Sequence, residues 1–134
     1  MKEKEIIQKI IDLIGEVENA TVISALDFSE ERGPHMIVVG IDKTEQVNVG
    51  LPDYKYTLNI TIDSFIEDDP DGELFHNILS TVQEKTHKFI NREASLETAF
   101  QEIPIVGWIN SDIDITITAE SNRAILNSEL IASF

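Results

Sequence analysis

The residues best suited to chemistry form an almost wholly acidic stretch at positions 67–73. Carboxylates at alternate positions followed by a glycine are typical of calcium-binding loops. If Gly72 is aligned with the obligatory glycine of such a loop, Ile78 takes the last position, where a bidentate glutamate is required, and Pro70 falls inside the loop. We therefore expect a solvated segment that caps a helix, with weak cation binding or contact with a partner as the alternatives.

The spacing of the three histidines does not predict a metal site. His76 and His87 share a face of one predicted helix, but they lie roughly 16 Å apart along its axis. That separation is too long for two ligands of one ion, and His35 is close to neither of them in the sequence. We expect three ordinary surface or boundary histidines, with no catalytic or metal-binding role.

Motifs for nucleophilic catalysis and for cofactor binding are missing from the sequence. It contains no Gly-x-Ser-x-Gly elbow and no glycine-rich phosphate loop, and it has no cysteine, which excludes thiolate nucleophiles and Cys-based zinc sites. Paired carboxylates are expected by chance among 25 acidic residues. The sequence therefore predicts no catalytic residue, no cofactor, and a role other than that of an enzyme.

Several residues are candidates for contacts with other proteins. Phe65 interrupts the polar face of a predicted strand just before the acidic stretch. Trp108 could anchor an interface, with packing in the core as the alternative. The last predicted strand ends on Phe134, and a terminal strand at the edge of a sheet is open to pairing with another chain. The predicted interface residues are Phe65, Glu67, Asp68, Asp69, Asp71, Trp108 and Phe134.

The charge balance restricts the classes of partner. The chain has 25 acidic and 10 basic residues, for a formal net charge of -15. Its field repels phosphate, so we expect no direct binding to nucleic acid and none to anionic membranes. The sequence shows no signal-peptide pattern and no apolar run of about 20 residues that could cross a bilayer. We expect the protein in the cytoplasm or in a particle assembled there.

The length of 134 residues predicts one domain covering positions 1–134. Apolar residues recur with helical spacing over positions 6–17 and again over 74–90. Asp69 is the expected N-cap of the second helix, and Pro70 is its expected first residue. Because each helix carries a single apolar stripe, both are expected to pack on one face of a sheet.

The strands are predicted from β-branched runs and from alternation of apolar and polar residues. The segment 36–41 is apolar throughout and is expected inside the sheet, whereas 56–66 alternates most regularly. A helical turn is expected at 95–102. The fold class is thus α+β, with an antiparallel or mixed sheet of four to six strands and two long helices packed on one face. The predicted strands are a short one within 20–34, then 36–41, 46–51, 56–66, 112–118 and 124–134.

The order of the elements carries a family resemblance. An N-terminal amphipathic helix precedes the segment Gly-Pro-His-Met-Ile-Val-Val at 33–39, and the alternating strand at 56–62 runs through Phe65 into Asp71 and Gly72. A long helix and a closing hairpin that contains Asn122 and Arg123 complete the pattern. This arrangement resembles the small phage proteins that terminate or complete tails and join them to heads.

The resemblance implies a non-enzymatic subunit that assembles as a ring, usually a hexamer. Such a ring caps the tail tube and offers a surface to the head connector, so the implied partners are copies of the chain and a tail-tube or connector protein. The implied location is the virion, or the host cytoplasm during assembly. A negatively charged channel would let DNA pass without holding its phosphates.

Two other classes of function remain open. An acidic mimic of nucleic acid would use its carboxylates to occupy a basic site on a DNA-handling protein, and would be a monomer or a dimer. A small hydrolase or ligand-binding domain would need a pocket with converging polar groups that the sequence does not reveal.

Overall fold

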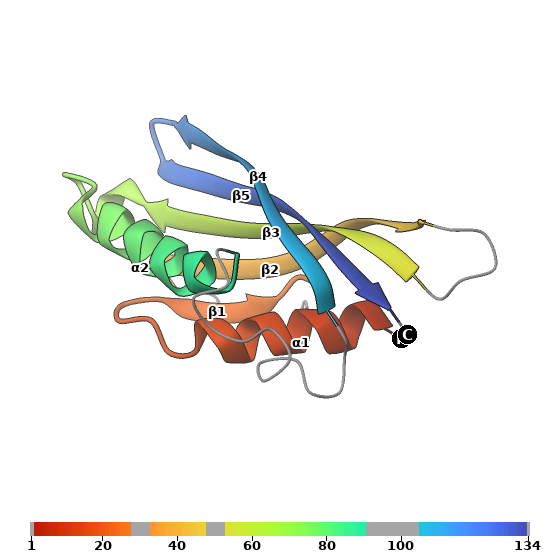
Figure 1. Ribbon diagram of the computed structural model, residues 1–134. Coiled ribbons are helices and arrows are strands. Elements are labelled where there is room, and N and C mark those ends of the chain that lie inside the picture. Colours follow the sequence, from red (N-terminus) through yellow and green to blue (C-terminus); the bar gives the residue numbers. More distant parts are fainter. Residues whose placement is uncertain (1, 28–32, 48–52, 91–104, 134) are drawn as a thin grey trace.

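The computed structural model describes residues 2–27, 33–47, 53–90 and 105–133, which form a five-stranded sheet and two α-helices (Figure 1). The strand order is β1-β2-β3-β5-β4, with β1 parallel to β2 and every other pair antiparallel. The predicted α+β class with a mixed sheet of four to six strands is confirmed. In chain order the elements are α1 (Lys2–Ile14), β1 (Thr21–Ser24), β2 (His35–Gln46), β3 (Asp53–Phe65), the 3-10 helix η1 (Ile66–Asp68), α2 (Glu73–Ile90), β4 (Ile105–Ile117) and β5 (Ser121–Ser133).

The hydrophobic core lies between one face of the sheet and the two helices, which have 13 and 18 residues. Side chains alternate across the pleat of a strand, so every second residue of β3 points into this core. The apolar stripes of both helices meet the same set of strand residues, as expected from their spacing. The core includes Ile6, Ile10 and Ile14 of α1, Tyr56, Leu58, Ile60 and Ile62 of β3, and Phe75, Ile78 and Val82 of α2. None of the helices in the described ranges is long and apolar enough to span a bilayer.

The end of α1 is determined by backbone geometry. Gly15 has a φ of 65°, a conformation that glycine adopts without steric cost, and its N–H donates to the carbonyl oxygen of Ile11 at 2.9 Å. The Nζ of Lys85 on α2 donates to the carbonyl oxygens of Ile14 and Glu16. The helix end is thus capped by a residue from the other helix.

The strands differ from the sequence prediction between positions 36 and 56. One strand, β2, runs from His35 to Gln46 and has a bulge between Ile41 and Lys43, where two separate strands were expected. Val47 follows this strand in a bend, and β3 begins at Asp53. The rest of the predicted strand at 46–51, together with the helical turn predicted at 95–102, lies outside the described residues.

The last strand does not lie at an edge of the sheet. β5 pairs with β3 on one side and with β4 on the other, so the expectation of a C-terminal edge strand is wrong. The two edges are formed by β1, which has four residues, and by β4, which has 13. The long open edge therefore belongs to the first strand of the closing hairpin.

Candidate functional site

The structure separates the predicted interface residues into an exposed group and a buried group. Phe65, Glu67, Asp68 and Asp71 are exposed at the end of β3 and in the segment that leads to α2. Asp69 and Trp108 are buried, with exposed fractions of 3% and 4%. Phe134 lies outside the described residues. The predicted set is therefore not a single surface.

The buried Asp69 caps the start of α2, although it precedes the first residue of the helix, Glu73, in the sequence. Its Oδ1 accepts a hydrogen bond from the N–H of Leu74 at 3.1 Å, and its Oδ2 accepts one from the N–H of Phe75 at 2.9 Å. Because Gly72, with a φ of 75°, turns the chain before the helix begins, the carboxylate reaches residues five and six positions ahead. Neither the N-cap position expected for Asp69 nor the first helical position expected for Pro70 is observed, since α2 begins at Glu73.

These contacts determine the ionisation of Asp69. Burial raises the pKa of this carboxyl group, but the hydrogen bonds from the N–H groups of Phe75 and Leu74, followed by the charge of His35, outweigh burial and lower the pKa below its ordinary value. The negative charge also faces the positive end of the helix dipole. Asp69 is thus buried and charged, and it stabilises the start of α2.

A serine, a histidine and an aspartate meet beneath the start of α2. The Nδ1 of His35 lies 2.9 Å from the Oγ of Ser64, and the charge of His35 acts on Asp69. These are the residue types of a hydrolytic triad, but there the aspartate, and not the serine, binds the Nδ1. All three residues are buried, with exposed fractions of 4% or less, so a substrate cannot reach them in this structure. The expectation that His35 lies at the surface or boundary is wrong, because it is the first residue of β2 and its side chain packs inward. We assign the cluster to the packing of β2, β3 and α2.

Trp108 belongs to the core and not to the surface. Its Nε1 donates a hydrogen bond to the Oγ of Ser128 at 3.0 Å, which satisfies the indole N–H within the β4–β5 pair. The side chain is part of the same hydrophobic cluster as the helices. Of the two alternatives weighed from the sequence, the structure favours core packing.

The exposed acidic residues lie beside the turn of the β4–β5 hairpin. The N–H of Ile66 donates to the carbonyl oxygen of Glu120 at 2.9 Å, which joins η1 to that turn. Glu67, Asp68 and Glu120 are all exposed there. Within the described ranges, no group of three or more His, Cys, Asp or Glu side chains has the geometry to hold a metal ion.

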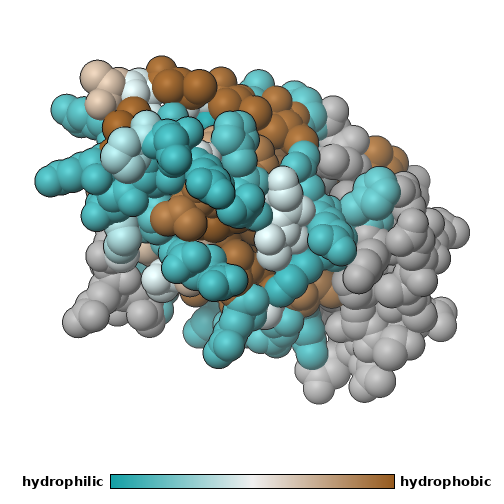
Figure 2. All heavy atoms as spheres, turned by 90° about the vertical axis from the view of Figure 1, so that its left-hand side faces the viewer, coloured by the Kyte–Doolittle hydropathy of each residue, from teal (hydrophilic) through white to brown (hydrophobic). Residues whose placement is uncertain are grey.

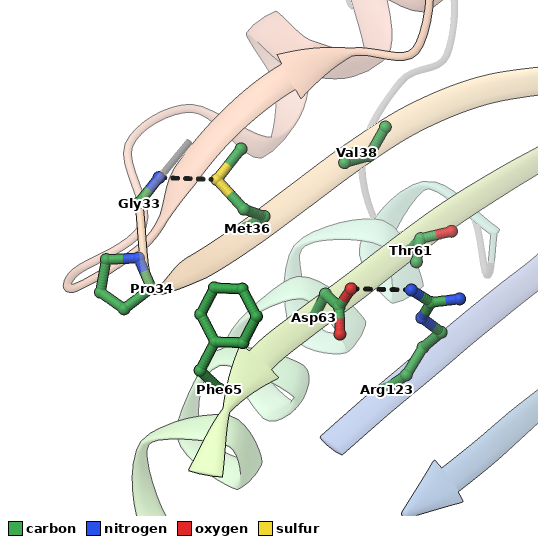
Figure 3. Close-up of a pocket in the computed structure, with 8 residues that line it drawn as sticks. All are labelled: Gly33, Pro34, Met36, Val38, Thr61, Asp63, Phe65 and Arg123. Atoms are coloured by element: carbon green, nitrogen blue, oxygen red, sulfur yellow. Dashed lines mark hydrogen bonds and ion pairs between the residues drawn. The ribbon is translucent and has the colours of Figure 1, made fainter. Parts of the chain in front are cut away.

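A shallow hollow lies on the face of the sheet opposite the helices (Figure 3). Its volume is about 210 Å³. Arg123 donates from Nη2 to the Oδ2 of Asp63 at 2.9 Å, whereas the Oδ1 of Asp63 is buried without a hydrogen-bond partner in the structure. The half-exposed ring of Phe65 forms part of the wall. The lining consists of Gly33, Pro34, Met36, Val38, Thr61, Asp63, Phe65 and Arg123.

The edge strand β4 carries apolar residues that the sequence did not single out as a surface. Ile109, Ile115 and Ile117 have exposed fractions of 59%, 53% and 74%. Figure 2 shows apolar atoms gathered over the upper part of the molecule, where Figure 1 places the turn end of the β4–β5 hairpin. The alternation at 112–118 predicts a strand, but it does not predict which of the apolar residues remain exposed. The two terminal isoleucines of the strand are thus left uncovered.

No protein-family model matches the chain, and no curated protein matches it.

Proposed function

We propose that this chain is a non-enzymatic structural subunit of a phage or prophage particle, a tail terminator or head-tail joining protein that assembles as a ring. The observation that carries the proposal is the long edge strand β4 with its exposed isoleucines, beside which the described part of the chain places no further strand. Monomeric proteins usually protect such an edge with charges, bulges or covering elements, because its free backbone groups pair readily with another chain. The last two isoleucines of β4 lie in a stretch without a bulge.

A ring requires two different surfaces on each subunit. Contacts in a closed ring are heterologous, so a surface of one subunit meets a different surface of the next subunit. The exposed side chains of Ile115 and Ile117 supply one apolar surface, and the exposed acidic segment around Glu67 and Asp68 lies at the same end of the molecule. A subunit with these features is suited to assembly with copies of itself and with a tail-tube or connector protein.

The net charge of -15 supports a role beside DNA without binding to it. A wall of carboxylates repels phosphate, so DNA would pass through such a ring without being held. The same charge opposes assembly, because the subunits repel one another. Salt screens exposed charges over about 10 Å at 0.1 M, so rings are expected to form more readily as the salt concentration rises.

Sedimentation velocity tests this proposal over a range of protein and salt concentrations. We expect a species with the mass of a ring, such as a hexamer, whose population rises with protein and salt concentration. The double variant Ile115→Gln with Ile117→Gln should assemble less. Leu26→Gln with Val47→Gln serves as the control, because it also replaces two exposed apolar side chains, lies outside β4 and leaves the net charge unchanged. A strict monomer throughout, with no binding to purified tail-tube or connector protein, would contradict the proposal.

The exposed acidic end favours a second candidate. Glu67, Asp68, Asp71 and Glu120 present carboxylates around one end of the molecule, and an inhibitor that mimics nucleic acid would use such an array to fill a basic site. That protein would stay a monomer or a dimer in the same sedimentation experiment. It would bind a DNA-handling protein in competition with DNA.

A further inference from the structure

We propose that residues 112–117 of β4 bind an extended segment of a partner protein in which apolar residues alternate with lysine or arginine. This inference rests on the proposed assembly function and names the chemistry of the partner at the β4 edge. The incoming segment would extend the sheet by one strand, which is a common mode of peptide recognition.

The backbone of residues 112–117 has the regular extended geometry that pairing with another strand requires. β4 has bulges between Ile105 and Gly107 and between Asn110 and Asp112, but it pairs with β5 in regular register from Asp112 to Ile117. Among the described residues β4 has one neighbouring strand, β5, and no strand pairs with the other side of its backbone. Six residues in regular register match the usual length of a strand.

The two faces of the segment differ in chemistry. Ile113 lies opposite Leu126 and Ile115 lies opposite Ala124, so these isoleucines continue the face that carries the core. The exposed fraction rises along this face to 53% at Ile115 and 74% at Ile117. An apolar side chain on an added strand would cover part of this surface and would be stabilised by it.

The other face carries two carboxylates that have no cationic partner within the described ranges. The Nδ2 of Asn127 donates to the Oδ1 of Asp112 at 2.8 Å and to the Oδ2 of Asp114 at 3.3 Å. Among the described residues no lysine or arginine forms a salt bridge with either aspartate, and the nearby Arg123 is paired with Asp63. Basic side chains on an added strand would lie opposite these carboxylates and pair with them.

Charge complementarity disfavours a second copy of the chain as the strand added at residues 112–117. β4 contains two aspartates and no lysine or arginine, so pairing between two β4 strands would bring like charges together. The other edge strand, β1, has the sequence Thr-Val-Ile-Ser and offers no cation. With a net charge of -15 on each copy, the favoured occupant is a basic and apolar segment of a different protein.

The test uses a short capped peptide of alternating lysine and valine that carries a fluorophore. Its binding to the full chain is measured by fluorescence anisotropy at several salt concentrations. Two peptides serve as controls, one with glutamate in place of each lysine and one with the same lysines and valines in two separate blocks. We expect binding of the alternating lysine peptide alone, and we expect it to weaken as salt rises.

Matched variants locate the site. Asp112→Asn with Asp114→Asn should weaken binding roughly three- to tenfold, because two cross-strand charge pairs are lost. Glu67→Gln with Asp68→Asn removes the same charge from the exposed acidic segment and should leave binding unchanged. Ile115→Gln with Ile117→Gln should weaken binding without a change in net charge.

The possible outcomes separate this inference from the proposed function. A monomer that binds the alternating peptide through Asp112 and Asp114 upholds the inference even if no ring forms. A chain that forms rings but does not discriminate among the peptides overturns the inference and leaves the proposed function standing. If both double charge variants weaken peptide binding equally, the peptide is attracted by the negative charge of the whole protein. That outcome would also overturn the inference.

Discussion

The ammonium group of Lys85 on α2 donates a hydrogen bond to the carbonyl oxygen of Ile14, the last residue of α1. A second hydrogen bond joins the same Nζ to the carbonyl oxygen of Glu16 at 3.1 Å. The carbonyl groups at the end of a helix have no partner within it, and they form the negative end of its dipole. One cation therefore satisfies the end of α1 and holds the two helices together over the sheet.

Replacing Lys85 with Met should lower the free energy of unfolding by about 1–2 kcal/mol, because the carbonyl groups lose a charged donor while the aliphatic stem is retained. Urea denaturation measures the change. Lys4→Met is the control, since Lys4 is exposed on α1 and its loss changes the net charge equally. Equal midpoints for the two variants would contradict the capping role of Lys85.

Replacing Asp69 with Asn should lower the free energy of unfolding by about 1–2 kcal/mol at neutral pH. The amide keeps one acceptor, so one of the N–H groups of Leu74 and Phe75 loses its bond. Urea denaturation measures the loss, and Asp68→Asn is the control because Asp68 is exposed. We expect the control to match the parent.

The effect of Asp69 should depend on pH in a defined direction. Its pKa in the folded protein is lowered from the ordinary value of 3.8, so its stabilisation is present above that value and is lost as the pH falls through the folded pKa. The difference in unfolding free energy between the parent and Asp69→Asn should therefore shrink in acid. A difference that stays constant from neutral to strongly acidic pH would show that the charge of Asp69 does not stabilise the fold.

Replacing Ile78 or Leu79 with Ala should lower the free energy of unfolding by about 2–5 kcal/mol. Both side chains lie on the core-facing side of α2 and are buried, with exposed fractions of 2% and 7%. Ile117→Ala removes the same type of side chain from a position that is 74% exposed, and should change stability little. If all three variants unfold at the parent's urea midpoint, the wrong face of α2 has been assigned to the core.

Replacing Trp108 with Phe should lower the free energy of unfolding by about 1–3 kcal/mol without changing the affinity of self-association. The variant leaves the buried hydroxyl group of Ser128 without its indole donor. Urea denaturation followed by circular dichroism gives the first quantity, and sedimentation velocity gives the second. A variant with parental stability but weaker self-association would show that Trp108 acts at an interface and not in the core.

The periodic elements could be predicted because their pattern is local. Tyr56, Leu58, Ile60 and Ile62 are buried along β3 as the alternation predicts, and the apolar stripe of α2 reaches the core as its spacing predicts. Backbone geometry alone determines on which face of a helix or strand each side chain lies. The α+β class follows from these elements, since each must bury one face against another.

The strand order and the exposed surface could not be predicted, because they depend on contacts between distant parts of the chain. Arg123 meets Asp63, 60 residues earlier, only because β5 lies beside β3. The local sequence of β5 marks it as a strand but carries no sign that β4 lies outside it. Asp69 has the residue type of a cap, but the turn at Gly72 determines which N–H groups it reaches.

The interior position of β5 has a consequence for the order of events during translation. β3 and β4 have no contact in the sheet except through β5, so β4 has no partner strand until residues 121–133 have left the ribosome. Until then the growing chain exposes the open side of β3 as well as the isoleucines of β4. A nascent chain stalled within β5 should therefore bind holdase chaperones that release the finished protein.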